Sequence, residues 1–524
     1  MSEVDTQARR RGGRAARQAE RAAPLREDMR PIRPGLHGGQ YRPLSDRDIQ
    51  RIHGAVLELL ETVGLCDAIP TCIEAMTAVG CHVGANGRLL IPRGVVEDTL
   101  AKAARRFPLY AQDPARDLEP WDKKVHYGTA GAAVHMVDAV TGLYRESLLD
   151  DLYDIARLVD SLDNIHFYQR SVVPRDMTDP RDMDINTLYA CISGTTKHVG
   201  SSFVAPGHVE EGFDILHMVA GGEDKWRARP FVSMSCCFVV PPLKFAEDAC
   251  RCLEVGVRGG MPILLLAAGQ AGATSPAALA GAVVLQVAEV LAGLVYVNAI
   301  KPGAPAIFGP WPFVSDLRTG AMSGGSGEQA LLSSACAQMA QFYDLTGGVP
   351  AGMTDSKVPD AQAGYEKGYT EVTAGLAGTN LVYESAGMHA SLLGSCFESY
   401  VIDNDLIGAA LRTVRGIDVN DETLSVEVIR QVCVDGPGHF LGHDQTLNLM
   451  QREYFYPQIG DRTSPKEWVE RGSTNVVQKA RARVKETLAA HYPSHISEDI
   501  DRKIRARSNI QLPRNHMRAG DGRW

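Results

Sequence analysis

The 524-residue chain lacks several signatures that would assign a function at once. Neither a G-x-S-x-G motif nor a P-loop occurs, so nothing supports α/β-hydrolase chemistry or nucleotide hydrolysis. No C-x-x-C pair occurs among the eleven cysteines, and their spacing resembles no structural zinc site. We therefore expect buried, reduced cysteines and no protein-bound metal.

Long apolar runs are also missing. The most apolar stretch, Ala277 to Ala299, is interrupted by Gln286, Glu289 and Asn298, so we expect a buried helix there and not a membrane span. The start of the chain has no apolar run of the signal-peptide type. These absences predict a cytoplasmic protein without a membrane partner.

An excess of positive charge is absent as well. The net charge of −9 argues against a nucleic-acid partner for the body of the protein. The stretch from Met1 to Arg33 is different, because it carries nine arginines among small and polar residues. We expect residues 1–40 to form a disordered basic tail, and a contact with an acidic partner protein is the alternative.

The remaining chain divides by its periodicity. Residues 41–120 predict an α-rich N-terminal cap, in which the apolar positions from Ser45 to Gly64 fall on one helical face. Residues 121–415 alternate between apolar strand candidates and amphipathic helices. Residues 416–524 are helical and polar, and we expect a helical extension that packs on this body or on another subunit of a homo-oligomer.

Eight strand candidates and eight helix candidates alternate within residues 121–415. The predicted strands cover Val125–Val137, Ile165–Val173, His198–Ala205, Phe231–Val239, Pro262–Ala268, Ala304–Trp311, Gly348–Met353 and Asn380–Met388. The predicted helices cover Leu148–Leu162, Asp182–Ile192, Val209–Val219, Lys244–Val257, Pro276–Val295, Ser326–Tyr343, Ala361–Leu376 and Phe397–Val414.

This alternation predicts an α/β fold, specifically a (β/α)₈ TIM barrel. A doubly wound open sheet is the alternative, but no G-x-G-x-x-G follows the first predicted strand. In a barrel, the residues at the carboxyl ends of the strands meet at one mouth. The predicted mouth includes His135, Asp138, Arg170, Arg175, Phe203, Gln270, Trp311, Phe313, Asp355, Lys357, Tyr383, Glu384 and His389.

One stretch is denser in reactive groups than the others. TDSKVPDAQAGYEKGY, from Thr354 to Tyr369, follows a short apolar strand candidate and leads into a predicted helix. Aromatic rings beside carboxylates suit a cation, and quaternary ammonium is a common guest of such cages. Glu384 is notable because it follows Leu381, Val382 and Tyr383 within an apolar strand candidate, where a buried carboxylate needs a partner. Several of these residues are equally consistent with core packing or helix capping.

The same stretch, together with GTAGAAVHMVDAVTG (Gly128–Gly142) and PFVSMSCCFVVPPLKF (Pro230–Phe245), resembles the trimethylamine methyltransferase family. The resemblance runs from about Ser45 into the C-terminal region, and it implies a (β/α)₈ barrel. It also implies transfer of a methyl group from a methylated amine to the cobalt(I) of a separate corrinoid protein. The archaeal trimethylamine enzymes of this family contain pyrrolysine, whereas this chain contains standard residues only.

The pyrrolysine-free relatives with assigned substrates act on quaternary amines such as glycine betaine. The resemblance therefore implies a quaternary-amine methyltransferase with no tightly bound cofactor and with cobalamin supplied by a cognate corrinoid protein. Position and chemistry suggest Glu384 and Asp355 as groups that complement the substrate's charge. The suggested substrate-binding residues are Trp311, Phe313, Tyr365 and Tyr383 around the cation, and Lys357, Arg318 and His389 for a carboxylate.

Other functions remain open from the sequence. Trimethylamine or another methylamine could be the substrate. A barrel lyase or hydrolase that uses Glu384 and His389 as acid and base is a different enzyme class. A non-catalytic quaternary-amine-binding protein is a third possibility.

Overall fold

The computed structural model describes residues 25–129 and 131–524. The chain divides into two compact units: Pro34–Arg415 with Pro457–Trp524, and Met1–Arg33 with Gly416–Tyr456. The part of the second unit that is described contains the short helix η1 (Glu27–Met29) and the helices α15 (Val426–Cys433) and α16 (Asp444–Leu449). All the predicted site residues belong to the first unit, which is the larger one.

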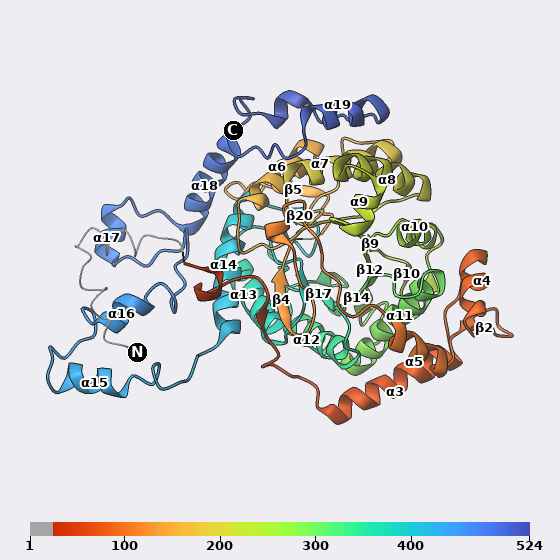
Figure 1. Ribbon diagram of the computed structural model, residues 1–524, viewed down its shortest axis with the longest axis horizontal. Helices are drawn as coiled ribbons and strands as arrows, with labels where there is room; N and C mark the ends of the chain where they lie inside the picture. Colours follow the sequence, from red (N-terminus) through yellow and green to blue (C-terminus); the bar gives the residue numbers. More distant parts are fainter. Residues whose placement is uncertain (1–24, 130) are drawn as a thin grey trace. The chain divides into compact units, whose positions relative to one another are not determined.

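In the described part of the larger unit, eight parallel strands lie at the centre of a ring of helices (Figure 1). They are β4 (Lys124–Tyr127), β7 (Tyr168–Gln169), β8 (Val199–Ser201), β9 (Val232–Cys236), β12 (Ile263–Ala267), β14 (Ala306–Pro310), β17 (Gly348–Pro350) and β18 (Leu381–Tyr383).

The strands form two sheets. One has the order β14-β12-β9-β8-β7, and the other has the order β1-β4-β18-β17, where β1 (Leu36–His37) is antiparallel to β4. Single parallel bridges, Gly128 with Phe167 and Phe308 with Gly347, link the edges of the two sheets. The fold is therefore α/β with parallel strands, and among the described residues these two bridges connect the edges of the two sheets.

A helix follows each of these parallel strands along the chain. They are α6 (Leu149–Asp160), α7 (Pro180–Gly194), α8 (Pro206–Ala220), α10 (Glu247–Arg258), α11 (Leu279–Ile300), α12 (Gly327–Phe342), α13 (Ala361–Leu376) and α14 (Phe397–Arg415), and the short α9 (Glu223–Ala228) comes after α8. Side-chain caps define several starts: Asp179, Ser326 and Asp360 each accept a hydrogen bond from a first-turn N–H.

Helix α11 is the most apolar element. Among the described residues it is the one helix long and apolar enough to cross a membrane by length and composition, and 83% of its apolar window is buried within the structure. It packs against α3 (Asp46–Thr62), α4 (Pro70–Ala78) and α5 (Arg93–Lys102), and against the strands β12 and β14 that precede and follow it in the chain. Burial on all sides explains why the helix has no polar face, and this agrees with the buried helix expected from the sequence.

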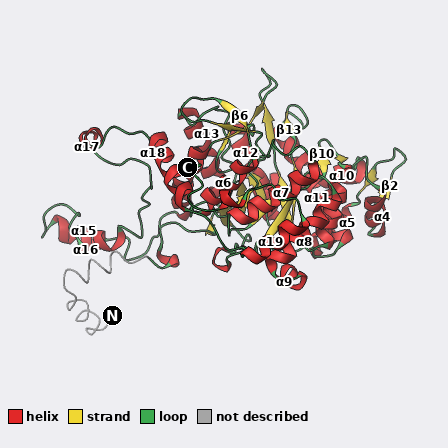
Figure 2. Cartoon of the chain, turned by 90° about the horizontal axis from the view of Figure 1, so that it is seen from above, coloured by secondary structure: helices red, strands yellow, loops and turns green. Residues whose placement is uncertain are grey.

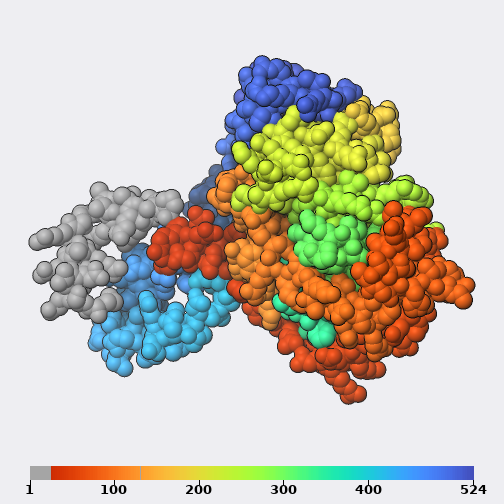
Figure 3. All heavy atoms as spheres, turned by 45° about the vertical axis from the view of Figure 1, so that its right-hand side comes forward, coloured from red at the N-terminus to blue at the C-terminus, as the bar shows by residue number. Residues whose placement is uncertain are grey.

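The N-terminal helices cover one side of the larger unit. A capping box between Ser45 and Asp48 starts α3, and the hairpin β2 (His82–Val83) with β3 (Leu89–Leu90) connects α4 to α5. Red to orange N-terminal residues cover much of the face turned forward in Figure 3. The short η2 (Pro114–Arg116) precedes β4.

The C-terminal segment of the larger unit contains α17 (Pro465–Glu470), α18 (Val476–Ala490), α19 (Glu498–Arg507) and η3 (Arg514–Met517). Helix α18 packs on α14 and α6, and α19 packs on α8. The stretch expected as one extension, residues 416–524, is thus divided between the two units.

Short strands extend the loops that follow the parallel strands. β5 (His135–Val137), β6 (Tyr144–Glu146), β19 (Met388–His389) and β20 (Gly394–Ser395) form one small sheet, and β13 (Gln270–Ala271), β15 (Phe313–Ser315) and β16 (Met322–Ser323) form another. The hairpin β10 (Val239–Val240) with β11 (Lys244–Phe245) follows β9. In Figure 2, β6 and β13 lie at the same edge of the unit.

Some predicted boundaries were wrong. The strand expected over Val125–Val137 is two strands, β4 and β5, and Gly131 between them has a φ of 136°. The strand expected over Asn380–Met388 ends at Tyr383, because Glu384 adopts a left-handed φ of 67°. Residues 1–24 of the predicted disordered tail lie outside the described residues, and Leu36–His37 within it form β1.

Candidate active site

The loop from Thr354 to Asp360 connects β17 to α13 at the carboxyl end of the strand, and its own hydrogen bonds hold it. Thr354 Oγ1 and the Asp355 backbone N–H both donate to Glu366 Oε2, at 2.6 and 2.8 Å. Ser356 Oγ donates to Asp360 Oδ1 at 2.8 Å, and Asp360 caps α13. This dense motif therefore forms an ordered turn.

Asp355 joins three loops. Its carboxylate accepts hydrogen bonds from Ser323 Oγ at 2.6 Å, from the Gly324 N–H at 2.7 Å and from Ser391 Oγ. Ser323 and Gly324 follow β14, whereas Ser391 follows β18. Both carboxylate oxygens are thus used within the protein, which favours a role for Asp355 in positioning the loops around the site.

Glu384 lies at the end of β18 and is fully buried. Within residues 25–129 and 131–524, neither of its carboxylate oxygens has a hydrogen-bond partner. Burial raises the pKa of Glu384 to about 8, and the nearby Lys367 acts in the opposite direction. A buried carboxyl group without a partner is costly when ionised, so it either keeps a proton or receives a cationic ligand.

Further buried charges surround Glu384. Lys367 Nζ lies 2.6 Å from Asp403 Oδ2, which also accepts a hydrogen bond from the Gly387 N–H at 2.7 Å. Glu371 lies one helical turn after Lys367 in α13, and its two carboxylate oxygens have no hydrogen-bond partner in the described chain. Burial, and then Asp403, raise the pKa of Glu371 well above its usual value. Three buried carboxyl groups therefore share one amine.

An aromatic cluster includes the residue next to Glu384. The Tyr383 ring lies 5.4 Å from that of Trp311 and 5.0 Å from that of Phe167, between centroids. Trp311 also contacts Phe313 edge to face at 6.2 Å. All four rings are buried, and the Trp311 indole N–H has no partner among the residues described. Such ring faces attract ammonium groups.

His389 is buried on β19. Its Nε2 lies 2.6 Å from Ser399 Oγ, and its Nδ1 has no partner within the described residues. Burial and the charge of Lys367 lower the pKa of His389 well below its usual value. The ring is therefore neutral near pH 7 and offers no positive charge to a substrate carboxylate.

Three predicted site residues lie outside the buried group. Tyr365 is 59% exposed on α13. The Arg318 side chain is 88% exposed and pairs with Asp316 at 2.6 Å. Lys357 is exposed, and its Nζ donates to the Asp355 carbonyl at 2.6 Å. Residue type and proximity to the signature loop suggested all three, but helical phase and local pairing direct them to the surface.

Arg170 directly follows β7. The sequence predicted that it lies at the barrel mouth, but assigned it no role. Its backbone N–H donates to the Gly200 carbonyl at 2.9 Å. Its partly buried guanidinium makes no hydrogen bond or ion pair with the chain that the structure describes. Burial lowers the pKa of Arg170, and Cys191, Asp184 and Cys237 oppose this shift. Since a guanidinium keeps its charge, an anionic ligand would stabilise it.

Lys367, Glu371 and Asp403 were missed altogether. A signal existed for two of them, because Lys367 and Glu371 are four residues apart on the helix face that α13 buries. Asp403 comes from α14, so only the fold brings it to Lys367. No group of three or more His, Cys, Asp or Glu side chains in residues 25–129 and 131–524 could hold a metal ion.

Comparison with known proteins defines the class. The sequence profile of the family described as trimethylamine methyltransferase (MTTB) matches residues 10–510. The chain therefore belongs to this methyltransferase family, as the sequence resemblance indicated.

Individual relatives have two different substrates in their names. The chain is 32% identical to the trimethylamine methyltransferase MttB of Methanosarcina thermophila over 476 residues, which cover 90% of this chain and 98% of that protein. It is 30% identical to the glycine betaine methyltransferase of Desulfitobacterium hafniense strain Y51 over 469 residues, which cover 89% and 96%. Among solved structures, the Methanosarcina barkeri monomethylamine methyltransferase (MtmB) is 13% identical with a TM-score of 0.46, covering 86% of this chain and 95% of that one.

Proposed function

We propose that this protein transfers a methyl group from a quaternary ammonium compound that carries a carboxylate, such as glycine betaine, to the cobalt(I) of a separate corrinoid protein. The observation that carries the proposal is the excess of buried carboxyl groups beside an aromatic cluster. Glu384 and Glu371 have no hydrogen-bond partner in the described chain, and Glu384 directly follows Tyr383. A quaternary ammonium group would complete this arrangement.

The chemistry of the substrate fits this environment. In a quaternary amine the nitrogen already bears positive charge, so its methyl carbon is activated for displacement without added acid. Cobalt(I) supplies the electron pair of the new bond to the methyl carbon, and the electrons of the broken C–N bond remain on nitrogen as a neutral amine. The protein's task is to orient the methyl group and stabilise charge. Trp311, Tyr383 and Glu384 would hold the ammonium group.

We assign a substrate carboxylate to Arg170. Of the three cations or potential cations considered from sequence, Lys357 and Arg318 are exposed and occupied by local contacts, and His389 is neutral. The guanidinium of Arg170 makes no hydrogen bond or ion pair in the chain as described, although the buried Asp184 is close enough to influence its pKa. It provides the bidentate geometry that carboxylates favour.

Trimethylamine is the second candidate, since the chain is similarly identical to relatives named for trimethylamine and for glycine betaine. This substrate has no carboxylate, so it would leave Arg170 without a ligand.

We also propose that the eight parallel strands close into a (β/α)₈ barrel. Parallel bridges at both seams, at Gly128 and Phe308, support closure. The proposed location of this protein is the cytoplasm. The corrinoid is proposed to be bound by the separate partner protein.

The test combines the protein with a reduced corrinoid protein and one amine at a time. Glycine betaine should produce methylcobalamin absorbance, whereas trimethylamine should not. Arg170→Met should weaken glycine betaine binding by roughly tenfold to a hundredfold, the range for a hydrogen bond between charged groups. Binding of tetramethylammonium, which has no carboxylate, should be unchanged.

Arg175→Met is the matched control, because Arg175 is exposed and pairs with Glu146 at 3.4 Å. Methyl transfer from trimethylamine alone would contradict the substrate assignment. Equal affinity of glycine betaine for the wild type and Arg170→Met would contradict the role of Arg170. Tight binding without methyl transfer to any corrinoid acceptor would instead support a binding protein.

A further inference from the structure

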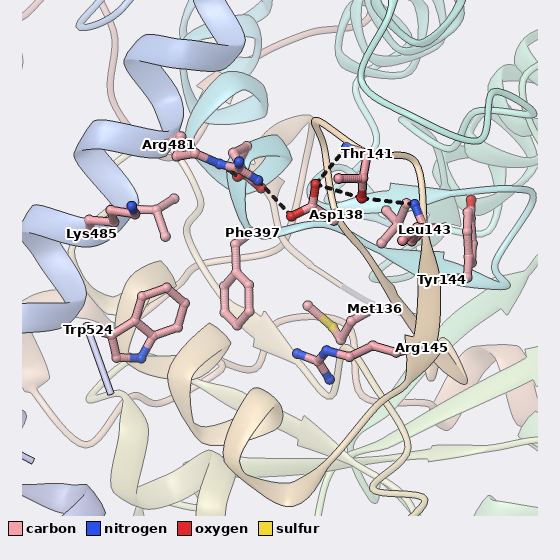
Figure 4. Close-up of a pocket in the computed structure, with 13 residues that line it drawn as sticks. Met136, Asp138, Thr141, Leu143, Tyr144, Arg145, Phe397, Arg481, Lys485 and Trp524 are labelled. Carbon is pink, nitrogen blue, oxygen red and sulfur yellow. Dashed lines mark hydrogen bonds and ion pairs between the residues drawn. The ribbon is translucent and has the colours of Figure 1, made fainter. Parts of the chain in front are cut away.

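A cavity of about 710 Å³ lies between the β5–β6 hairpin, the start of α14 and helix α18 (Figure 4). Its lining includes none of the residues assigned to the methylated amine. The volume falls within the range of small-molecule sites, which is roughly 300–1,000 Å³. The nature of its walls indicates which ligand would fit.

Aromatic and apolar side chains form much of the lining. The rings of Phe397 and Trp524 meet edge to face, with centroids 5.2 Å apart and planes at 76°. The Trp524 indole N–H donates to Asp154 Oδ2 at 2.8 Å, which fixes the ring. Met136 and Val484 add buried apolar surface. Figure 4 shows the rings of Phe397 and Trp524 side by side in this cavity. An apolar planar group would bury its surface against these residues.

The two arginines of the lining already have partners. Arg145 donates to both carboxylate oxygens of Asp151, at 2.6 and 2.7 Å. Arg481 donates from Nε to Glu398 Oε1 at 2.6 Å and from Nη2 to Asp138 Oδ2 at 2.9 Å. Each carboxylate of the lining therefore has an arginine partner, and the single guanidinium of Arg481 serves both Asp138 and Glu398.

Lys485 is the remaining cation of the lining. It lies one helical turn after Arg481 on α18, is exposed at the cavity, and makes no hydrogen bond or ion pair with residues 25–129 or 131–524. Its ammonium group can therefore receive an anion without losing another partner. We infer that the cavity binds a small aromatic molecule with one negative charge, whose ring contacts Phe397 and Trp524 and whose anionic group pairs with Lys485.

Calorimetry with two matched probes tests this inference on the full-length protein. 1-Naphthoate has a fused aromatic ring and one carboxylate, and naphthalene-1-carboxamide is its neutral analogue. We expect 1-naphthoate to bind at one site more tightly than the amide. Lys485→Met should weaken 1-naphthoate binding by roughly fivefold, the upper range for an exposed ion pair, and leave the amide unaffected.

Controls locate the binding at this cavity. Lys301→Met makes the same chemical change at an exposed lysine that does not line the cavity, so it should have no effect. Phe397→Leu should weaken both probes, because it removes a ring that both contact. The inference is overturned if 1-naphthoate does not bind the wild type, if the amide binds equally well, or if Lys485→Met binds both probes like the wild type.

Discussion

The pKa of Glu384 provides a quantitative test of the buried site. With a pKa of about 8, roughly nine-tenths of this carboxyl group is protonated at pH 7. A quaternary ammonium ligand favours the ionised form, so binding at pH 7 should release about 0.9 proton. The affinity should increase about tenfold between pH 7 and pH 9, which corresponds to about 1.4 kcal/mol.

Calorimetry with glycine betaine, in two buffers that differ in ionisation enthalpy, measures this proton release directly. Glu384→Gln should bind more weakly at pH 9, release no proton and lose the pH dependence. Glu328→Gln alters an exposed glutamate in the first turn of α12 and should behave like the wild type. Absence of proton release by the wild type would refute the reasoning, and persistence of the release in Glu384→Gln would assign it to another group, such as Glu371.

The same carboxyl group affects stability in the absence of ligand. Its folded-state pKa of about 8 lies above the ordinary value of 4.5, so the folded protein keeps a proton that the unfolded chain loses. The free energy of unfolding should therefore decrease as the pH rises from about 5 to about 8. Denaturant titrations across this range should show a smaller decrease for Glu384→Gln, and an equal decrease would contradict the assigned pKa.

Three other substitutions test the surroundings of Glu384. Trp311→Leu should reduce the affinity for a quaternary ammonium ligand by about twofold to thirtyfold, as expected for loss of a cation–π contact, and unchanged affinity in calorimetry would exclude this ring from the site. Lys367→Met leaves Asp403 buried without its partner and should lower the free energy of unfolding by about 3–5 kcal/mol in denaturant titrations. The double variant Lys367→Met with Asp403→Leu should recover much of this loss. A Lys367→Met protein as stable as the wild type would refute the pairing. Tyr365→Ala should leave substrate affinity unchanged because the ring is 59% exposed, and a large loss would instead assign Tyr365 to the substrate.

The elements and the family could be predicted from sequence because their signals are local or contiguous. Helix caps such as Asp360, and the alternation of apolar strands with amphipathic helices, depend on residues near one another in the chain. The signature motif from Thr354 to Tyr369 is a continuous run of residues, so its resemblance to the methyltransferase family does not depend on how the chain folds.

Strand ends were harder to predict. When a strand is buried on both sides, its sequence is apolar throughout, and this pattern does not indicate the residue at which the backbone turns. Glu384 illustrates this difficulty. Its position in an apolar run predicted burial, but its left-handed backbone ends β18 directly before it. The sequence therefore indicated an unusual carboxyl group without indicating its geometry.

Long-range charge pairing was decided by the tertiary structure alone. Lys367 and Asp403 are separated by 36 residues and meet only because α13 and α14 pack together. Asp355 looked like a substrate group in the sequence, yet in the fold it joins loops that follow β14 and β18. The role proposed for Arg170 rests on the structure, in which its guanidinium makes no hydrogen bond or ion pair with the described chain.

The sequence by itself therefore determined the methyltransferase family of the protein and indicated the segment at which the candidate site was sought. The tertiary structure decided which of the candidate groups face one another and which face solvent. The physical reason is that capping and hydrophobic periodicity act between neighbours in the chain, whereas the electrostatics of a buried site depends on groups from separate elements that are desolvated together.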